Sequence, residues 1–151
     1  MNRDDKSKTG VVIVDHGSRK EESNERLLEF VDLYRAATSY LAVEPAHMEI
    51  ATPTILDGFH ACKEKGAEQI IVCPFFLLPG RHWQSDIPRL AREASDACEY
   101  IPFLVSAPIG VHEKLIEILE SRIDFCVASH PNEICSSCTM ENNCKTNSNW
   151  S

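Results

Sequence analysis

The chain has 151 residues, of which 43% are hydrophobic and 25% charged, so it is long enough for one globular domain with its own core. Its formal net charge of -8 argues against non-specific nucleic-acid binding, which requires clustered positive charge. No apolar run approaches the roughly 20 residues that a membrane-spanning helix needs, and residues 1–9 are too polar for a secretory signal.

The chain opens with a strand-like segment followed by a helix-like one. Residues 10–15 are continuously apolar and largely β-branched, which is typical of a strand buried on both faces of a sheet. Ser18, with Glu21 three residues later, is a candidate helix N-cap. Apolar residues at helical spacing follow as far as Leu41, so the segment predicts an amphipathic helix.

The same alternation repeats in the next segment. Residues 43–51 are predicted to form the second strand. Thr52 and Pro53 then form the pattern of an N-cap followed by proline at the first helical position. Gly66 is placed to end this second helix.

Two further strand and helix pairs complete the pattern. Residues 68–78 are the most hydrophobic run and predict a central strand, in which Pro74 should cause a bulge or an early end. Ser85 and Asp86 open a third helix, residues 100–108 a fourth strand and residues 111–127 a last helix. The last helix carries apolar residues spaced for one buried stripe: Leu115, Leu119, Ile123 and Cys126.

Alternating strands and helices predict an α/β fold: a four-stranded parallel sheet with helices on both faces. We expect a flexible N-terminus over residues 1–9, a domain over 10–129 and a cysteine-bearing tail over 130–151. In such sheets, ligands bind beyond the carboxyl ends of the strands, where the strand order reverses.

Two histidines and a carboxylate fall at this predicted edge. His16 follows the first strand, Glu49 lies near the end of the second and His82 follows the third. Imidazole and carboxylate groups are suitable ligands for Fe(II), Co(II), Ni(II) or Zn(II). With only two or three protein ligands, the ion would keep open coordination positions for a reaction. Gly17 and Gly80 beside them would let a flat ligand approach the backbone. Two other histidines, His47 and His60, are interpreted as structural or solvent-facing.

The motifs DHGS (15–18) and FFLLPGRHWQSDIP (75–88) resemble those of the class II chelatases of sirohaem and cobalamin synthesis. The resemblance covers residues 10–127. The chain is most similar to the short form of the family and, within it, to the plant members. It implies a chelatase-like three-layer fold and a homodimer that makes up for the missing half of the two-domain members. It also implies chloroplast localisation and insertion of Fe(II) into sirohydrochlorin, with loss of two protons.

The resemblance assigns roles to individual residues. His16 and His82 match the family's metal-binding histidines, and Glu49 its active-site carboxylate. Because sirohydrochlorin carries carboxylates and this chain is acidic, we expect basic residues beside the ligands to contact the substrate. The expected substrate-binding residues are Ser18, Arg19, Gly80 and Arg81.

The seven cysteines fall into two groups. Cys62, Cys73, Cys98 and Cys126 lie in apolar segments, and most should be buried thiols that pack as small hydrophobes. The tail cysteines are compatible with an iron–sulfur cluster, zinc, a redox disulfide or no function. The resemblance favours a cluster, more specifically 2Fe–2S, with a fourth ligand from Cys126 or a second chain. The tail cysteines are Cys135, Cys138 and Cys144.

Two alternatives to iron insertion stay open. The same fold could insert cobalt, since histidine ligands suit both ions. A carrier of metal or tetrapyrrole could use the same two histidines without turnover.

Overall fold

The computed structural model describes residues 6–78, 80 and 82–128, apart from the side chain of His82. Strands and helices alternate as the sequence predicts. The strands are β1 (Thr9–Asp15), β2 (Ala42–His47), β3 (Gln69–Pro74) and β4 (Phe103–Val105). The helices are η1 (Lys6–Lys8), α1 (Glu21–Ala37), α2 (Ile55–Glu64), η2 (His82–Asp86), α3 (Ile87–Ala97) and α4 (Lys114–Ala128).

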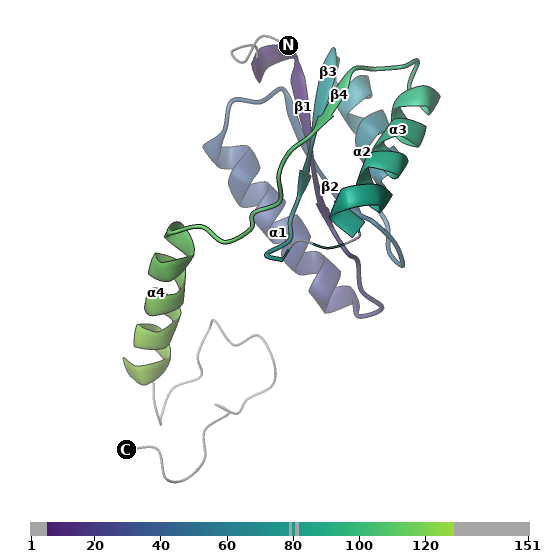
Figure 1. The fold of residues 1–151 in the computed structure, drawn as a ribbon. Helices are drawn as coiled ribbons and strands as arrows, with labels where there is room; N and C mark the ends of the chain where they lie inside the picture. The colour runs from purple at the N-terminus through teal and green to yellow at the C-terminus, as the bar shows by residue number, and fades with distance from the viewer. Residues whose placement is uncertain (1–5, 79, 81, 129–151) are drawn as a thin grey trace. The chain divides into compact units, whose positions relative to one another are not determined.

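The four strands form one parallel sheet in the order β2-β1-β3-β4 (Figure 1). β1 pairs with β2 on one side, where Asp15 faces His47, and with β3 on the other. Six of its seven residues are buried, because it has strand neighbours on both sides and helices on both faces. The prediction of a doubly buried first strand is confirmed.

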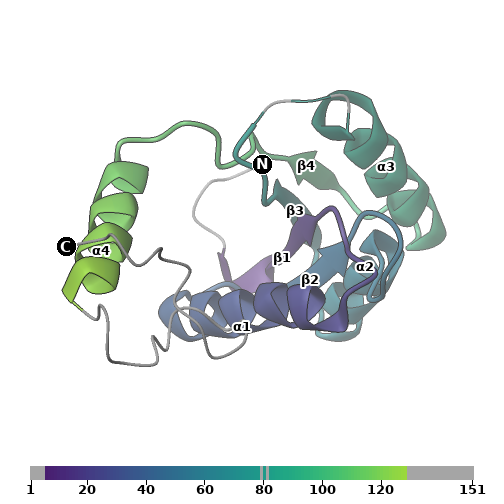
Figure 2. The same cartoon turned by 90° about the horizontal axis from the view of Figure 1, so that it is seen from below.

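Helices cover both faces of this sheet, as Figure 2 shows. On one face, Leu27 and Val31 of α1 pack with the buried side chains Val11, Ile13 and Val43. On the other face, α2 and α3 bury a larger cluster. Its largest members are Phe59, Ile70 and Ile87. The three-layer α/β fold predicted from the sequence is therefore confirmed.

Three strands are shorter than predicted. β3 ends at Pro74, as expected of a residue that cannot donate to the sheet. β2 ends at His47 and not at residue 51, because the chain then bends through a loop in which Ile50 has a φ of 71°. β4 spans only Phe103–Val105, because it is an edge strand that pairs with β3 alone.

The N-cap of α2 is Thr54, two residues after the predicted Thr52. The Thr54 hydroxyl accepts a hydrogen bond from the Asp57 backbone N–H, and the Asp57 carboxylate accepts one from the Thr54 backbone N–H. This capping box satisfies donors that the first helical turn leaves free. The hydrogen bonds from the Thr54 backbone and hydroxyl lower the pKa of Asp57. The ionised Asp57 carboxylate therefore stabilises the fold at pH values above the usual pKa of aspartate. This stabilisation is lost as the pH falls through the lowered pKa of Asp57.

Thr54→Ala should reduce the free energy of unfolding by about 1 kcal/mol, the typical contribution of a helix N-cap. Thr52→Ala is the matched control. Thr52 is exposed and makes no hydrogen bond to the described residues, so its loss should change stability by less than about 0.5 kcal/mol. Urea unfolding curves measure both, and equal losses would contradict the assignment of the cap.

The other helix starts also differ from prediction. Ser18 is not the N-cap of α1, which is Lys20; the Ser18 hydroxyl instead accepts the Lys20 backbone N–H. Ser85 and Asp86 do precede α3 as predicted, and Asp86 is its N-cap, but both lie in η2, a π-helix that runs directly into α3, and the Asp86 side chain makes no capping hydrogen bond. Pro88 stands in the first turn of α3, where its missing N–H costs no hydrogen bond.

The chain divides into two compact units, residues 1–110 and 111–151. In the second unit the described residues are 111–128, which include α4. None of its residues is buried, so the predicted buried stripe is wrong for this chain taken alone. Leu115 is half-buried, whereas Leu119, Ile123 and Cys126 are exposed. Among the described residues of this unit, α4 has no second helix or strand against which to bury a stripe. No helix in the described ranges is long and apolar enough to cross a membrane.

Candidate metal-insertion site

The strand order reverses between β1 and β3, since the chain continues from β1 to β2 on one side and from β3 to β4 on the other. β1 and β3 are parallel, so their carboxyl ends, Asp15 and Pro74, lie at the same edge. This edge is the position at which open α/β sheets bind ligands. The segments with His16 and His82 follow these two strands.

His16 and Glu49 lie together at this edge, as predicted. The His16 Nε2 is 3.1 Å from the Glu49 Oε1, and the two side chains are 45% and 50% exposed. The backbone holds them there, because the N–H groups of Met48 and Glu49 donate to the carbonyls of Asp15 and His16. These bonds extend the pairing of β1 and β2 beyond the strand ends. Both groups are thus accessible to a ligand in solvent.

Gly17 makes this close approach possible. Its φ is +83°, which L side chains rarely adopt, and a Cβ added there would lie 2.1 Å from the Glu49 carbonyl oxygen. Its N–H donates to Asp15 Oδ1 at 3.0 Å, which closes a tight turn around His16. The contact with Glu49 and the turn both require glycine at this position.

The pair of His16 and Glu49 can act on a metal and on protons. A neutral imidazole nitrogen and a carboxylate oxygen at this separation can bind the same divalent ion, and the carboxylate can also accept protons. Within the described ranges, no group of three or more His, Cys, Asp or Glu side chains could hold a metal. Two protein groups suit a site that takes up and releases an ion better than a structural metal site.

The backbone of His82 begins η2, but its side chain is not described. The convergence of His16 and His82 on one ion therefore stays a prediction. The neighbouring Trp83 is half-buried, and its indole N–H donates to the Ser106 carbonyl at 3.4 Å, which ties η2 to the segment after β4. Gly80 is exposed, and the Gln84 N–H donates to its carbonyl.

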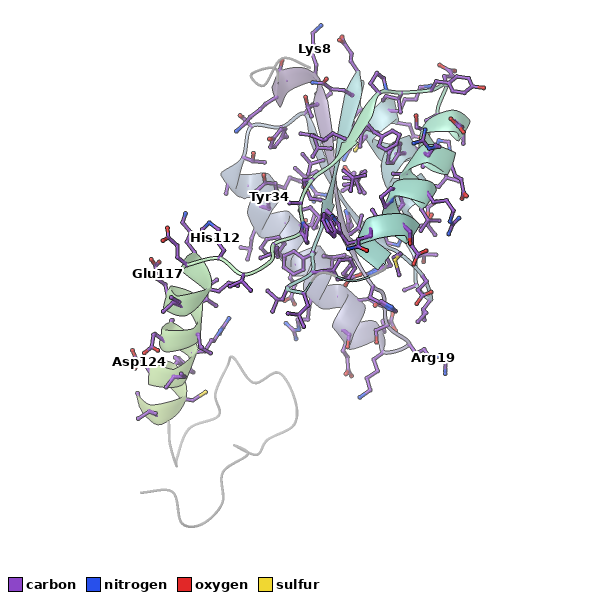
Figure 3. The ribbon with its side chains drawn as sticks, in the orientation of Figure 1. Lys8, Arg19, Tyr34, His112, Glu117 and Asp124 are labelled. Carbon is purple, nitrogen blue, oxygen red and sulfur yellow. The ribbon has the colours of Figure 1, made fainter. Side chains whose placement is uncertain are left out.

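The predicted substrate-binding residues have different surroundings. Arg19 is exposed near the start of α1 and makes no hydrogen bond or ion pair within the part of the chain that the structure describes (Figure 3). Ser18 is half-buried and has a structural role as well, because it exchanges two hydrogen bonds with the Asn24 side chain. A Cβ at Gly80 would meet no atom within 4 Å, so this backbone is open to a flat ligand. Arg81 lies outside the described residues.

Phe75 and Phe76 pack on opposite faces of the sheet. Phe75 contacts the ring of Phe30, with centroids 4.6 Å apart, and Phe76 packs against the core beneath α2 and α3. Both are only partly buried. These contacts make both rings part of the margin of the hydrophobic core.

The thiols of the folded part are free cysteines. Cys62 and Cys98 are buried as predicted, and burial raises the pKa of Cys62 to about 12, which keeps its thiol protonated. Cys73 is half-buried and Cys126 is exposed. The three tail cysteines lie beyond residue 128 and outside the described residues.

Sequence reasoning missed one feature next to the site. It interpreted His47 as structural or solvent-facing and gave Asp15 no role, but the two side chains form a pair at 2.5 Å, and Asp15 immediately precedes His16. The sequence gives only a weak signal for this pair: one aspartate and one histidine in two predicted strands. The register between these strands cannot be read from the sequence. Asp15 faces His47 only in the register that the folded sheet adopts.

The sequence profile of the CbiX family matches residues 10–125. The chain is 45% identical to the chloroplastic sirohydrochlorin ferrochelatase of Arabidopsis thaliana, over 90% of this chain and 61% of that protein. Its fold matches the sirohydrochlorin chelatase SirB of Bacillus subtilis subspecies spizizenii, solved with cobalt, with a TM-score of 0.72 and 31% identity. A structure of Bacillus subtilis SirB with Fe3+ matches with a TM-score of 0.72 and 28% identity.

The lengths of these proteins differ. The chain aligns with 50% of the cobalt-bound SirB chain and 49% of the Fe3+-bound one, using 78% and 83% of its own residues. The region that the profile matches contains β1 from Gly10 onward, β2 to β4, and the DHGS and RHWQSDIP segments with the predicted site residues. On this profile match and the shared fold, the chain belongs to the CbiX family.

Proposed function

We propose that this protein is a sirohydrochlorin ferrochelatase, a lyase that inserts Fe(II) into sirohydrochlorin to give sirohaem. The observation that carries the proposal is the contact of His16 Nε2 with Glu49 Oε1 at the carboxyl edge of the sheet. The name of the Arabidopsis relative supports the same activity. Because the chain spans less than two thirds of that relative, the activity of the whole protein stands here as a proposal.

The reaction exchanges one Fe(II) for two pyrrole protons. His16 binds the incoming ion through a neutral imidazole nitrogen, and His82 is proposed as the second nitrogen ligand. Glu49 accepts pyrrole protons or balances the charge of the ion, because a carboxylate next to a cation stays ionised.

A chelation assay tests the proposal. The protein is mixed with an excess of metal-free sirohydrochlorin and Fe(II) under anaerobic conditions, and the change in the macrocycle's visible spectrum is followed. An enzyme produces many equivalents of sirohaem per chain, faster than the uncatalysed reaction. A carrier binds at most about one equivalent per chain and leaves the rate of insertion unchanged, which would overturn the proposal.

Cobalt insertion is the second candidate, and one observation favours it: the similar SirB structure from Bacillus subtilis subspecies spizizenii was solved with cobalt. Imidazole and carboxylate ligands suit both ions, and such sites generally bind Co(II) more tightly than Fe(II). The same assay with Co(II) in parallel compares kcat/KM for the two ions. A higher value for cobalt would reassign the substrate metal without changing the site.

Arg19→Ala should raise the KM for sirohydrochlorin by about 3- to 10-fold, equivalent to one lost charge-assisted hydrogen bond. The side chain is exposed, close in sequence to His16 and without a protein partner in the described ranges. Arg92→Ala removes the same charge from the surface of α3 and is the control. Equal effects of the two substitutions, or a loss confined to kcat, would contradict a substrate contact by Arg19.

A homodimer is the proposed assembly. The chain matches only about half of each SirB chain, so a second copy would supply the equivalent of the other half. Sedimentation equilibrium at micromolar concentration tests this, and a purely monomeric, active protein would overturn it. Localisation in the chloroplast is proposed from the name of the Arabidopsis relative. The domain limits predicted from the sequence, with a domain over 10–129 and a tail from 130, also remain a proposal.

The tail is proposed to bind an iron–sulfur cluster, of the 2Fe–2S type, through Cys135, Cys138 and Cys144. Its support is the spacing of three cysteines and the family resemblance described above. Protein purified without oxygen should contain iron, sulfide and visible absorption, and the triple Cys→Ser variant should lose all three while inserting metal at the wild-type rate. Colourless protein without sulfide would exclude the cluster.

A further inference from the structure

A pair formed by the partly buried Asp15 and the buried His47 lies next to the proposed metal site. His47 is fully buried at 0% exposure, and its Nδ1 is 2.5 Å from Asp15 Oδ1. Asp15 is the last residue of β1 and faces His47, the last residue of β2. Because a carboxylate only accepts hydrogen bonds, Nδ1 of His47 carries the proton that they share.

A buried histidine at this position reduces the stability of the fold if its only role is to fill space. Its other ring nitrogen, Nε2, is buried and has no hydrogen-bond partner among the described residues. A buried polar atom without a partner destabilises a fold, so an apolar residue of similar size would pack here at lower cost. The retained benefit must therefore come from Nδ1 and the carboxylate that it contacts.

The Asp15 carboxylate connects His47 to both arms of the site. The same Oδ1 accepts the His47 Nδ1–H and the Gly17 backbone N–H, which closes the turn that carries His16. Gly17 in turn packs against the Glu49 carbonyl, where no Cβ would fit. The position of His16 relative to Glu49 thus depends on where the Asp15 carboxylate is held.

His47 is also anchored on the opposite side. Its backbone N–H donates to the Pro53 carbonyl at 2.7 Å, and His47 forms a parallel bridge with Thr54. The loop that carries Glu49 lies between His47 and Pro53, so both ends of this loop are tied to His47. One buried residue therefore restrains the turn of His16 and the loop of Glu49 together.

We propose that His47 is a positioning residue for metal insertion: through Asp15 it holds His16 and Glu49 at the separation that binds the incoming ion. The predicted effect of His47 on kcat rests on the proposed function, whereas its predicted effect on metal affinity does not. Partners behind a metal ligand orient it, and their removal typically costs about 10- to 100-fold in metal affinity or activity.

Three substitutions at one position test the proposal. His47→Asn keeps an N–H donor close to the place of Nδ1, His47→Gln moves the donor towards the place of Nε2, and His47→Leu has none. His47→Asn should keep kcat within about 3-fold of wild type. His47→Leu and His47→Gln should lower kcat by about 10- to 100-fold. The KM for sirohydrochlorin should change less than about 2-fold, because His47 is buried and cannot contact the macrocycle. His60→Leu, on the exposed side of α2, is the control and should leave kcat unchanged.

A second readout does not depend on turnover. Co2+ added without tetrapyrrole gives absorption bands that report the ligands of the ion, and their titration gives a Kd. The Kd should rise about 10-fold in His47→Leu and His47→Gln and stay near the wild-type value in His47→Asn. If His47→Leu fails to fold, as judged by circular dichroism, the comparison of His47→Asn with His47→Gln decides.

The outcomes separate the inference from the proposed function. Wild-type protein that inserts no metal, but whose Co2+ affinity depends on His47 as expected, would refute the function and support the positioning role. Active wild-type protein whose His47→Gln and His47→Asn variants have equal kcat and equal Kd would overturn the positioning role. A loss of stability in all three variants, with kcat and Kd unchanged, would show that His47 serves only the fold.

Discussion

His16→Ala should lower kcat for metal insertion by at least about 100-fold, because it removes a proposed ligand of the ion, and even the partners behind a ligand contribute 10- to 100-fold. The fold should remain, since His16 is half-exposed and contributes no part of the core. Stopped-flow insertion rates and thermal unfolding of the same samples measure both effects. His82→Ala should behave in the same way if its imidazole is the second nitrogen ligand.

The control for this prediction is His112→Ala. His112 belongs to the second unit and accepts the Lys114 backbone N–H at 3.2 Å, which is a local contact at the start of α4. Its loss should leave kcat unchanged. If the double variant of His16 and His82 inserted iron at the wild-type rate, neither histidine would be a ligand.

Gly17→Ala should reduce the free energy of unfolding by about 2–4 kcal/mol and kcat by about 100-fold. The added Cβ meets the Glu49 carbonyl oxygen at 2.1 Å, and alanine also disfavours a φ of +83°. The strained backbone and the overpacked contact each cost on the order of 1–3 kcal/mol. The chain must separate the His16 turn from Glu49 to relieve the clash, and a displacement of about 1 Å at a reacting group costs about 100-fold.

Gly66→Ala separates the two causes. Gly66 also has a positive φ, of +91°, but a Cβ there would meet no atom within 4 Å. It should lose about 1 kcal/mol of stability from the backbone alone and keep full activity. Chemical unfolding and insertion rates measure both variants. If Gly17→Ala matched Gly66→Ala in both, the contact between Gly17 and Glu49 would have no role in the site.

Local patterns in the sequence predict the order of strands and helices correctly. The apolar run of residues 10–15 is hydrophobic enough to require burial on both faces, and this places β1 inside the sheet. Pro74 ends β3, since proline has no N–H to donate. Element ends elsewhere depend on neighbours: Thr52 and Thr54 both suit an N-cap, and the pairing of Thr54 with Asp57 decides between them.

The burial of an amphipathic stripe cannot be predicted from spacing alone. The pattern of α4 is correct for a helix, and the helix forms over Lys114–Ala128. No residue of α4 is buried in the single chain. The surface that would cover its apolar side chains is set by tertiary or quaternary contacts and not by the sequence of the helix. A periodic pattern identifies the face that avoids water but not the partner that covers it.

The sequence by itself determined that this is an α/β protein with His16 and Glu49 at the carboxyl edge of its sheet, because strand and helix periodicity are local properties and parallel strands end at a common edge. Only the tertiary structure decided that His16 and Glu49 touch, that Gly17 must lack a Cβ and that His47 lies buried against Asp15. These contacts depend on the register between β1 and β2, and a shift of one residue would turn each side chain to the other face of the sheet.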